Sequence, residues 1–186
     1  TRPRRFGKTV MANMLGAFLT KSAATAKLFA QLKIGRDAEA MQHINQYNVI
    51  YIDFSRISSN DYQSYIDNIA DALKNDLHKA YPDVDYRAAG GVAEDLERIT
   101  AATGERFIFI FDEWDAIFHA AFISEDDRKK YLLFLKDLLK DRVYVQLAYM
   151  TGVLPISKYT SGSELNTFAE YNMATMSLYS DVFGFN

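Results

Sequence analysis

Three consecutive residues near the start of the chain, Gly7, Lys8 and Thr9, have the types and order of a phosphate-binding loop. They satisfy the end of the P-loop pattern GxxxxGK(S/T), while Arg2 stands at the position of its first glycine. Glycine lets the backbone approach a phosphate chain, lysine reaches the β- and γ-phosphates, and the threonine hydroxyl ligates Mg²⁺. A basic loop before a helix would show the same residues. We predict nucleotide-binding residues over the whole segment: Arg4, Arg5, Phe6, Gly7, Lys8, Thr9 and Val10.

A pair of acids, Asp112 and Glu113, directly follows the apolar run 107–111. A buried strand that delivers an acid to the edge of a sheet is the Walker B arrangement. There Asp112, together with Thr9, would hold Mg²⁺, and Glu113 would act as the general base on the attacking water. The alternative is a solvated polar loop after a strand. Both motifs occur in the order that a nucleotide site requires, and this favours the catalytic interpretation.

Thr151 ends the next expected strand, where a polar side chain can reach the γ-phosphate or the attacking water. It is therefore a candidate catalytic residue beside Lys8 and Glu113, although a plain Thr-Gly turn would look the same. Lys158 is expected to be a surface lysine. The three histidines are too scattered for a metal site, and the aromatic residues near these motifs are expected in the core: Trp114, Tyr131 and Phe134.

The elements that must position these residues alternate between strand and helix patterns. Strands are predicted over 48–54, 107–111 and 143–150, the second without alternation because both faces of its sheet are covered. Helices are predicted after Thr9, over 62–77, around 92–99, over 124–139 and, short, near 163–171, with residues 24–47 partly helical and a turn at Gly35. This order predicts an α/β fold with a mainly parallel sheet and helices on both faces, and ligands beyond the carboxyl ends of its strands.

The length and composition of the chain limit the number of domains and the classes of partner that we expect. The 186 residues suit one domain spanning 1–186, and the net charge of −3 offers no broad field for nucleic acid. Four cations within the first eight residues instead suggest a local anion site. The absence of cysteine excludes disulfides and zinc-thiolate sites and is compatible with a cytoplasmic location, which we expect. No apolar run reaches the roughly 20 residues that span a bilayer, so no membrane partner is expected.

Four segments together resemble the predicted AAA-ATPase-like family: 2–9 (RPRRFGKT), 49–55 (VIYIDFS), 111–115 (FDEWD) and 150–158 (MTGVLPISK). The resemblance covers essentially the whole chain. It implies a three-layer P-loop NTPase fold of the AAA-like ASCE division that uses ATP and Mg²⁺ at Gly7, Lys8, Thr9, Asp112 and Glu113, with Thr151 as sensor. Members often continue into a domain similar to PD-(D/E)xK nucleases, which would link the chain to nucleic acid only indirectly. This chain departs from the family at Trp114, where tyrosine is common, and in a looser segment 159–166.

A P-loop fold also places a central strand directly before the loop, and no residue precedes Thr1. We therefore expect an N-terminally truncated domain that lacks this strand, and a higher melting temperature when about 20–30 native residues are restored. The leading functional hypothesis is slow, Mg²⁺-dependent ATP hydrolysis that regulates an appended effector domain, with an arginine supplied by a second copy or a partner subunit. The alternatives are a non-catalytic nucleotide-binding or interaction module with a degenerate P-loop, supported by Arg2, and, ranked last, a small-molecule kinase.

Overall fold

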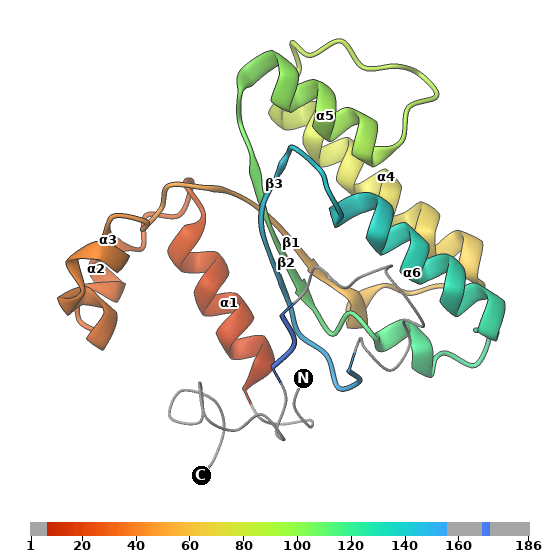
Figure 1. The fold of residues 1–186 in the computed structure, drawn as a ribbon, viewed down its shortest axis with the longest axis horizontal. Helices are drawn as coiled ribbons and strands as arrows, with labels where there is room; N and C mark the ends of the chain where they lie inside the picture. Colours follow the sequence, from red (N-terminus) through yellow and green to blue (C-terminus); the bar gives the residue numbers. More distant parts are fainter. Residues whose placement is uncertain (1–6, 156–168, 172–186) are drawn as a thin grey trace.

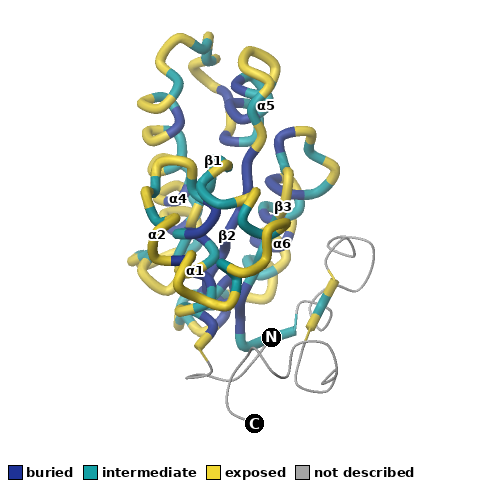
Figure 2. Tube along the Cα trace, turned by 90° about the vertical axis from the view of Figure 1, so that its left-hand side faces the viewer, coloured by how far each residue is buried: buried dark blue, intermediate teal, exposed yellow. Residues whose placement is uncertain are grey.

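Three β-strands form a single parallel sheet in the order β1-β2-β3. The computed structural model of the chain describes residues 7–155 and 169–171. The three predicted strands are confirmed, with bounds that differ by one or two residues: β1 (Asn48–Asp53), β2 (Phe107–Asp112) and β3 (Val145–Met150). All six residues of β2 are buried, and Figure 2 shows this strand buried along its length. Its continuous apolar run follows from its central position, where both faces meet helices.

Alternate side chains of β2 serve two separate cores. Phe107, Phe109 and Phe111 pack into the larger core with α4 (Tyr62–Ala80), α5 (Val92–Thr103) and α6 (Glu125–Leu139). Ile108 and Ile110 pack on the other face into a smaller core with α1 (Lys8–Leu19). Figure 1 shows α1 on one side of the sheet and α4, α5 and α6 on the other. Helices therefore cover both faces, as the alternation of patterns predicts.

The ends of the helices follow from a few local residues. Ser124 begins α6 with a capping box, in which its hydroxyl and Asp127 exchange hydrogen bonds with each other's backbone amides. Gly104 ends α5 in the left-handed conformation, at φ 72°. Helix α4 begins at the predicted residue, Tyr62, and extends three residues beyond the predicted end. Asp61, whose carboxylate accepts a 2.9 Å hydrogen bond from Ser64 N, caps this helix.

Helix α1 begins at Lys8, one residue before Thr9, and two of its apolar side chains face solvent. Val10 is 61% exposed and Met14 is 40% exposed. Most residues of α1 are apolar, so periodicity alone does not select the buried face. In the structure Lys8, Ala12, Gly16, Phe18 and Leu19 are buried. Three short helices follow: α2 (Ala26–Phe29), the 3₁₀ helix η1 (Lys33–Arg36), which contains the predicted turn at Gly35, and α3 (Ala38–Met41).

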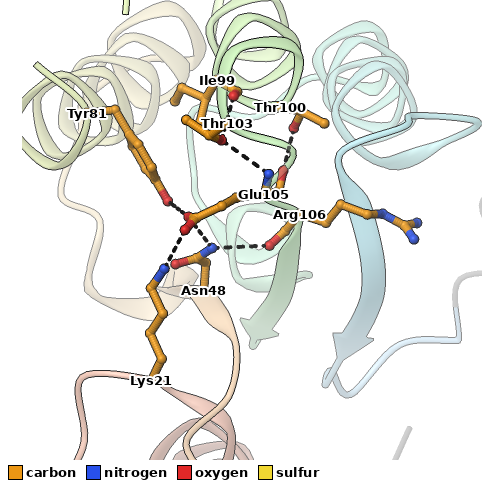
Figure 3. Close-up of polar contacts among 8 residues, drawn as sticks. All are labelled: Lys21, Asn48, Tyr81, Ile99, Thr100, Thr103, Glu105 and Arg106. Atoms are coloured by element: carbon orange, nitrogen blue, oxygen red, sulfur yellow. Dashed lines mark hydrogen bonds and ion pairs between the residues drawn. The ribbon is translucent and has the colours of Figure 1, made fainter. Parts of the chain in front are cut away.

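A polar cluster ties the elements together at the amino ends of the strands. Glu105 accepts hydrogen bonds from Tyr81 (2.5 Å), Asn48 (2.7 Å) and Lys21 (2.9 Å), as Figure 3 shows. These donors come from the end of α4, the start of β1 and the residues after α1. The Tyr81 hydroxyl, followed by Lys21, holds the pKa of the Glu105 carboxyl below its ordinary value. The cluster thus stabilises the carboxylate form of Glu105 and connects the elements at the end of the sheet opposite Asp112 and Glu113.

The remaining fold predictions have mixed outcomes. An α/β fold with a parallel sheet is confirmed, whereas its assignment to the P-loop NTPase class stays a prediction. Residues 163–168 of the predicted short helix lie outside the described residues, as do Lys158 and 159–166, and residues 169–171 form no helix. Across residues 7–155 and 169–171, no helix combines the length and apolar character needed to cross a bilayer.

Candidate functional site

The first turn of α1 has the properties expected of an anion site. Gly7 precedes it at φ 75°, a left-handed conformation that glycine adopts without steric strain, and the turn contains no acidic residue. Lys8 is 93% buried, an unusual position for a lysine, and Thr9 follows it half-buried. Figure 1 shows this end of α1 at the same end of the sheet as the carboxyl ends of the strands.

The two predicted acids lie where β2 ends, in direct contact with Thr151, which directly follows β3. The Thr151 hydroxyl donates to Asp112 Oδ1 and accepts a hydrogen bond from the backbone N–H of Glu113 at 3.2 Å. Backbone bonds reinforce the contact, because Thr151 N donates to Phe111 O at 2.8 Å and Trp114 N donates to Thr151 O at 3.0 Å. Asp112, Glu113 and Thr151 therefore form one connected group.

The second carboxylate oxygen of Asp112 is available to bind a cation. Asp112 is 1% exposed, yet its Oδ2 has no hydrogen-bond partner among the described residues. A buried carboxylate oxygen without a donor is unfavourable unless a cation or water completes its shell. Mg²⁺ in nucleotide sites is held by one or two protein carboxylates together with phosphate oxygens and water, so the Asp112 carboxylate, with the Thr9 hydroxyl, would be a sufficient protein donor set. The residues present fit Mg²⁺.

Glu113 combines a strained backbone with an available carboxylate. Its φ is 49°, a left-handed conformation that costs a non-glycine residue roughly 1–2 kcal/mol. Such strain is found preferentially at functional sites, where the surrounding structure enforces it. Here the hydrogen bond from Glu113 N to Thr151 and the neighbouring bond from Trp114 N enforce the turn. In the described part of the chain no side chain pairs with the Glu113 carboxylate.

Two tyrosines on the α1 face of the sheet are affected by the charge of Asp112. Burial, followed by the Asp112 carboxylate, raises the pKa of Tyr51 on β1 and of Tyr149 on β3 to about 12. Both phenols therefore stay neutral at physiological pH. They place neutral hydroxyl groups, and no further negative charge, near the strand ends.

The sequence motifs account for only part of this arrangement. The structure brings Asp112, Glu113 and Thr151 into contact and places Lys8 and Thr9 at the same end of the sheet. Arg4, Arg5 and Phe6 lie outside the described residues, and Val10 is mostly exposed. Trp114 is confirmed as core, since it is 2% exposed, and so is Tyr131; Phe134 is partly buried against this core.

Two further residues at the site escaped the sequence analysis. Asp115, which is 2% exposed, accepts hydrogen bonds from the amides of Val153 and Leu154, and Gly152 packs against Trp114. The only sequence sign of them is an aspartate three residues after Asp112 and a glycine directly after Thr151. Both patterns are too common to be assigned a role without the fold.

An open cleft of about 370 Å³ lies beside this site, between the segments that follow β1 and β2. Its walls come from the 3₁₀ helix η2 (Phe54–Arg56), residues 57–59, Tyr65, and residues in and after the 3₁₀ helix η3 (Ala116–His119). Neither Lys8 nor any of the strand-end residues Asp112, Glu113 and Thr151 lines this cleft. We therefore place the candidate phosphate site at the start of α1 and the strand ends, and not in the cleft.

A family model described as "Predicted AAA-ATPase" matches residues 1–160, which include the start of α1, both strand-end acids and Thr151. The chain belongs to the predicted AAA-ATPase family. For a predicted AAA-ATPase, ATP and Mg²⁺ are the expected ligands, and the match covers every residue assigned to the site. Comparison with curated proteins and comparison with solved structures each returned no match.

Proposed function

We propose that this domain binds ATP with Mg²⁺ at the start of α1 and hydrolyses it. The observation that carries the proposal is the pair formed by Asp112 and Glu113 at the end of β2. One acid is buried with an unpartnered oxygen, and the next has an available carboxylate on a strained backbone. A cation-binding carboxylate followed by a base is what hydrolysis of a phosphoanhydride needs.

The roles follow from position and chemistry. Lys8 would hold the β- and γ-phosphates at the start of α1, with Arg4 and Arg5 as further phosphate contacts. Asp112 and Thr9 would hold Mg²⁺, which when bound neutralises charge on the phosphate oxygens. Glu113 would accept a proton from the water whose oxygen forms the new bond to the γ-phosphorus. The bond from that phosphorus to the bridging oxygen breaks, ADP leaves with the electron pair, and Glu113 returns the proton to the products.

Thr151 would fix the geometry of this step. Its hydroxyl bonds both to Asp112 and to the amide of Glu113, so it sets the distance between the metal-binding acid and the base. We expect slow turnover by the domain alone. In many such NTPases an arginine from a second copy or a partner subunit stabilises the charge of the transition state, and without it hydrolysis is slow. Regulation of an appended effector domain and a cytoplasmic location remain predictions.

Steady-state ATP hydrolysis by the wild type and two variants tests the proposal. Lys8→Ala should lose both ATP affinity and turnover, and Glu113→Gln should bind ATP but lose turnover by about 100-fold or more, the scale of a lost general base. Glu39→Gln removes an exposed carboxylate on α3, away from the site, and should behave like the wild type. If Lys8→Ala and Glu113→Gln both hydrolysed ATP at the wild-type rate, the proposal would be wrong.

The same experiment separates hydrolysis from a non-catalytic module, for which Arg2 at the first glycine position is the supporting feature. Such a module would bind ATP without turnover, and Glu113→Gln would change nothing. A small-molecule kinase would instead transfer the γ-phosphate only when an acceptor other than water is added.

A further inference from the structure

Asp115 makes a buried connection between two segments that are far apart in sequence. Its carboxylate accepts hydrogen bonds from Val153 N at 3.0 and 3.2 Å, one to each oxygen, and from Leu154 N at 2.6 Å. These residues follow β3, whereas Asp115 follows β2, and 38 or 39 residues separate them. The contact therefore joins the turn that carries Glu113 to the segment that carries Thr151.

The chemistry of this contact favours a carboxylate, both of whose oxygens accept hydrogen bonds. Asp115 is 2% exposed, and in the part of the chain that the structure describes it forms no ion pair. Its charge is therefore stabilised mainly by two amides that donate to its two oxygens, a charge-assisted arrangement. Asparagine has nearly the same shape, but it carries no charge, and its NH₂ group in place of Oδ1 would face Val153 N, which lies 3.2 Å from that oxygen. Asp115→Asn thus opposes two donors at Oδ1 and removes the charge that strengthens the two hydrogen bonds at Oδ2, while leaving the volume nearly unchanged.

The contact with Asp115 continues a chain of interactions around the same turn. Gly152 lies so close to the Trp114 indole that a Cβ there would meet Trp114 Nε1 at 2.5 Å and Asp115 Oδ1 at 2.8 Å. The hydroxyl of Tyr131, on α6, donates a hydrogen bond to Trp114 O at 2.6 Å and so connects the turn to this helix. The segment 151–154 is thus bound to the turn 113–115 at every residue except Gly152, which packs against it.

We propose that Asp115 is a positioning residue for ATP hydrolysis. By holding segment 152–154 on the turn after β2, it keeps the Thr151 hydroxyl between Asp112 and the amide of Glu113, and so orients the base. This inference rests on the proposed ATPase function. It assigns Asp115 no contact with the nucleotide, because the phosphate-binding residues lie at the start of α1.

The first test is the division of the effect between turnover and binding. Asp115→Asn should lower kcat by about 10- to 100-fold, the scale of a misplaced catalytic group, and leave KM for ATP within about threefold. In a Thr151→Val background the same substitution should have little further effect, since its route to Glu113 is already broken. Asp95→Asn is the control for burial: Asp95 is fully buried on α5, away from the site, and its substitution should leave kcat unchanged.

The second test does not depend on activity. Amide hydrogen exchange of the wild type and Asp115→Asn, measured by NMR, should show faster exchange, by about tenfold or more, at Val153 and Leu154 and also at Glu113, whose amide bonds to Thr151. Asp95→Asn should leave these three amides unchanged relative to the rest of the sheet.

The two tests distinguish failure of this inference from failure of the proposed function. If the wild type does not hydrolyse ATP, the proposed function fails, and the exchange experiment alone decides whether Asp115 positions Glu113. The inference is wrong if exchange at Glu113 stays at the wild-type rate in Asp115→Asn. It is equally wrong if kcat falls no more than in Asp95→Asn, or if the Thr151→Val background leaves the effect at full size.

Discussion

The Thr151 hydroxyl gives the sharpest test of the geometry at the strand ends. Thr151→Val keeps the β-branched shape but removes the donor to Asp112 and the acceptor for the Glu113 amide. Asp112 is 1% exposed and Thr151 5%, so water does not readily replace the lost bonds. A buried polar group left without its partner costs about 1–3 kcal/mol, and two such groups here give an expected loss of about 2–4 kcal/mol.

Thr103→Val is a closely matched control. The Thr103 hydroxyl also donates one hydrogen bond, to Ile99 O at 2.7 Å, and accepts one from a backbone amide, Glu105 N at 3.1 Å. Thr103 is exposed, so water can replace both partners, and we expect a loss of about 0.5 kcal/mol. The measurement is the free energy of unfolding from urea denaturation of the wild type and both variants. Equal losses in the two variants would show that the Thr151 contacts are not the buried, coupled group described above.

Three further predictions concern backbone shape and pH. Gly152→Ala, whose Cβ would collide with Trp114, should destabilise the fold by about 1–3 kcal/mol and shift the emission of this single tryptophan, while Gly91→Ala, with no atom within 4 Å, should do neither. Gly7→Ala should cost about 1 kcal/mol from its positive φ alone, since its Cβ would also meet no atom within 4 Å, and thermal unfolding would detect this. The hydrogen bonds at Glu105 lower the pKa of its carboxyl in the folded state, so their stabilisation is present above the unfolded-state pKa and is lost as pH falls through the folded-state value. The stability difference between the wild type and Glu105→Gln should therefore be largest near pH 6 and shrink below about pH 4.3, and a difference that grew in acid would contradict this assignment.

The elements of the fold were predictable where one local feature dominates. The five apolar residues 107–111 predict a strand covered on both faces, Ser124 predicts a helix start, and Gly104 predicts a helix end, and all three are confirmed. The location of Asp112 and Glu113 at a strand end was predictable because they directly follow this apolar run. Parallel strands bring such carboxyl ends to one edge of the sheet, where ligands bind.

Other features depend on contacts that no local pattern encodes. The buried face of α1, from which Val10 and Met14 are excluded, was not predictable, because a helix that is apolar on nearly all sides has no periodic contrast. The cap of α4 was not predictable, because residues 58–61 are all capping types, and only the geometry selects Asp61. Asp115 was missed because its partners lie 38 residues away and are backbone amides, whose presence leaves no mark on the sequence.

The most direct test of the central claim is the dissociation constant of ATP in the presence of Mg²⁺, measured by titration calorimetry for the wild type, Lys8→Ala and Lys27→Ala. Lys8 is buried at the start of α1, and Lys27 is an exposed lysine on α2. Loss of a charged hydrogen-bonding partner of the phosphates should weaken binding about 10- to 100-fold in Lys8→Ala, while Lys27→Ala should bind like the wild type. Equal affinities in all three proteins would contradict a phosphate site at the start of α1.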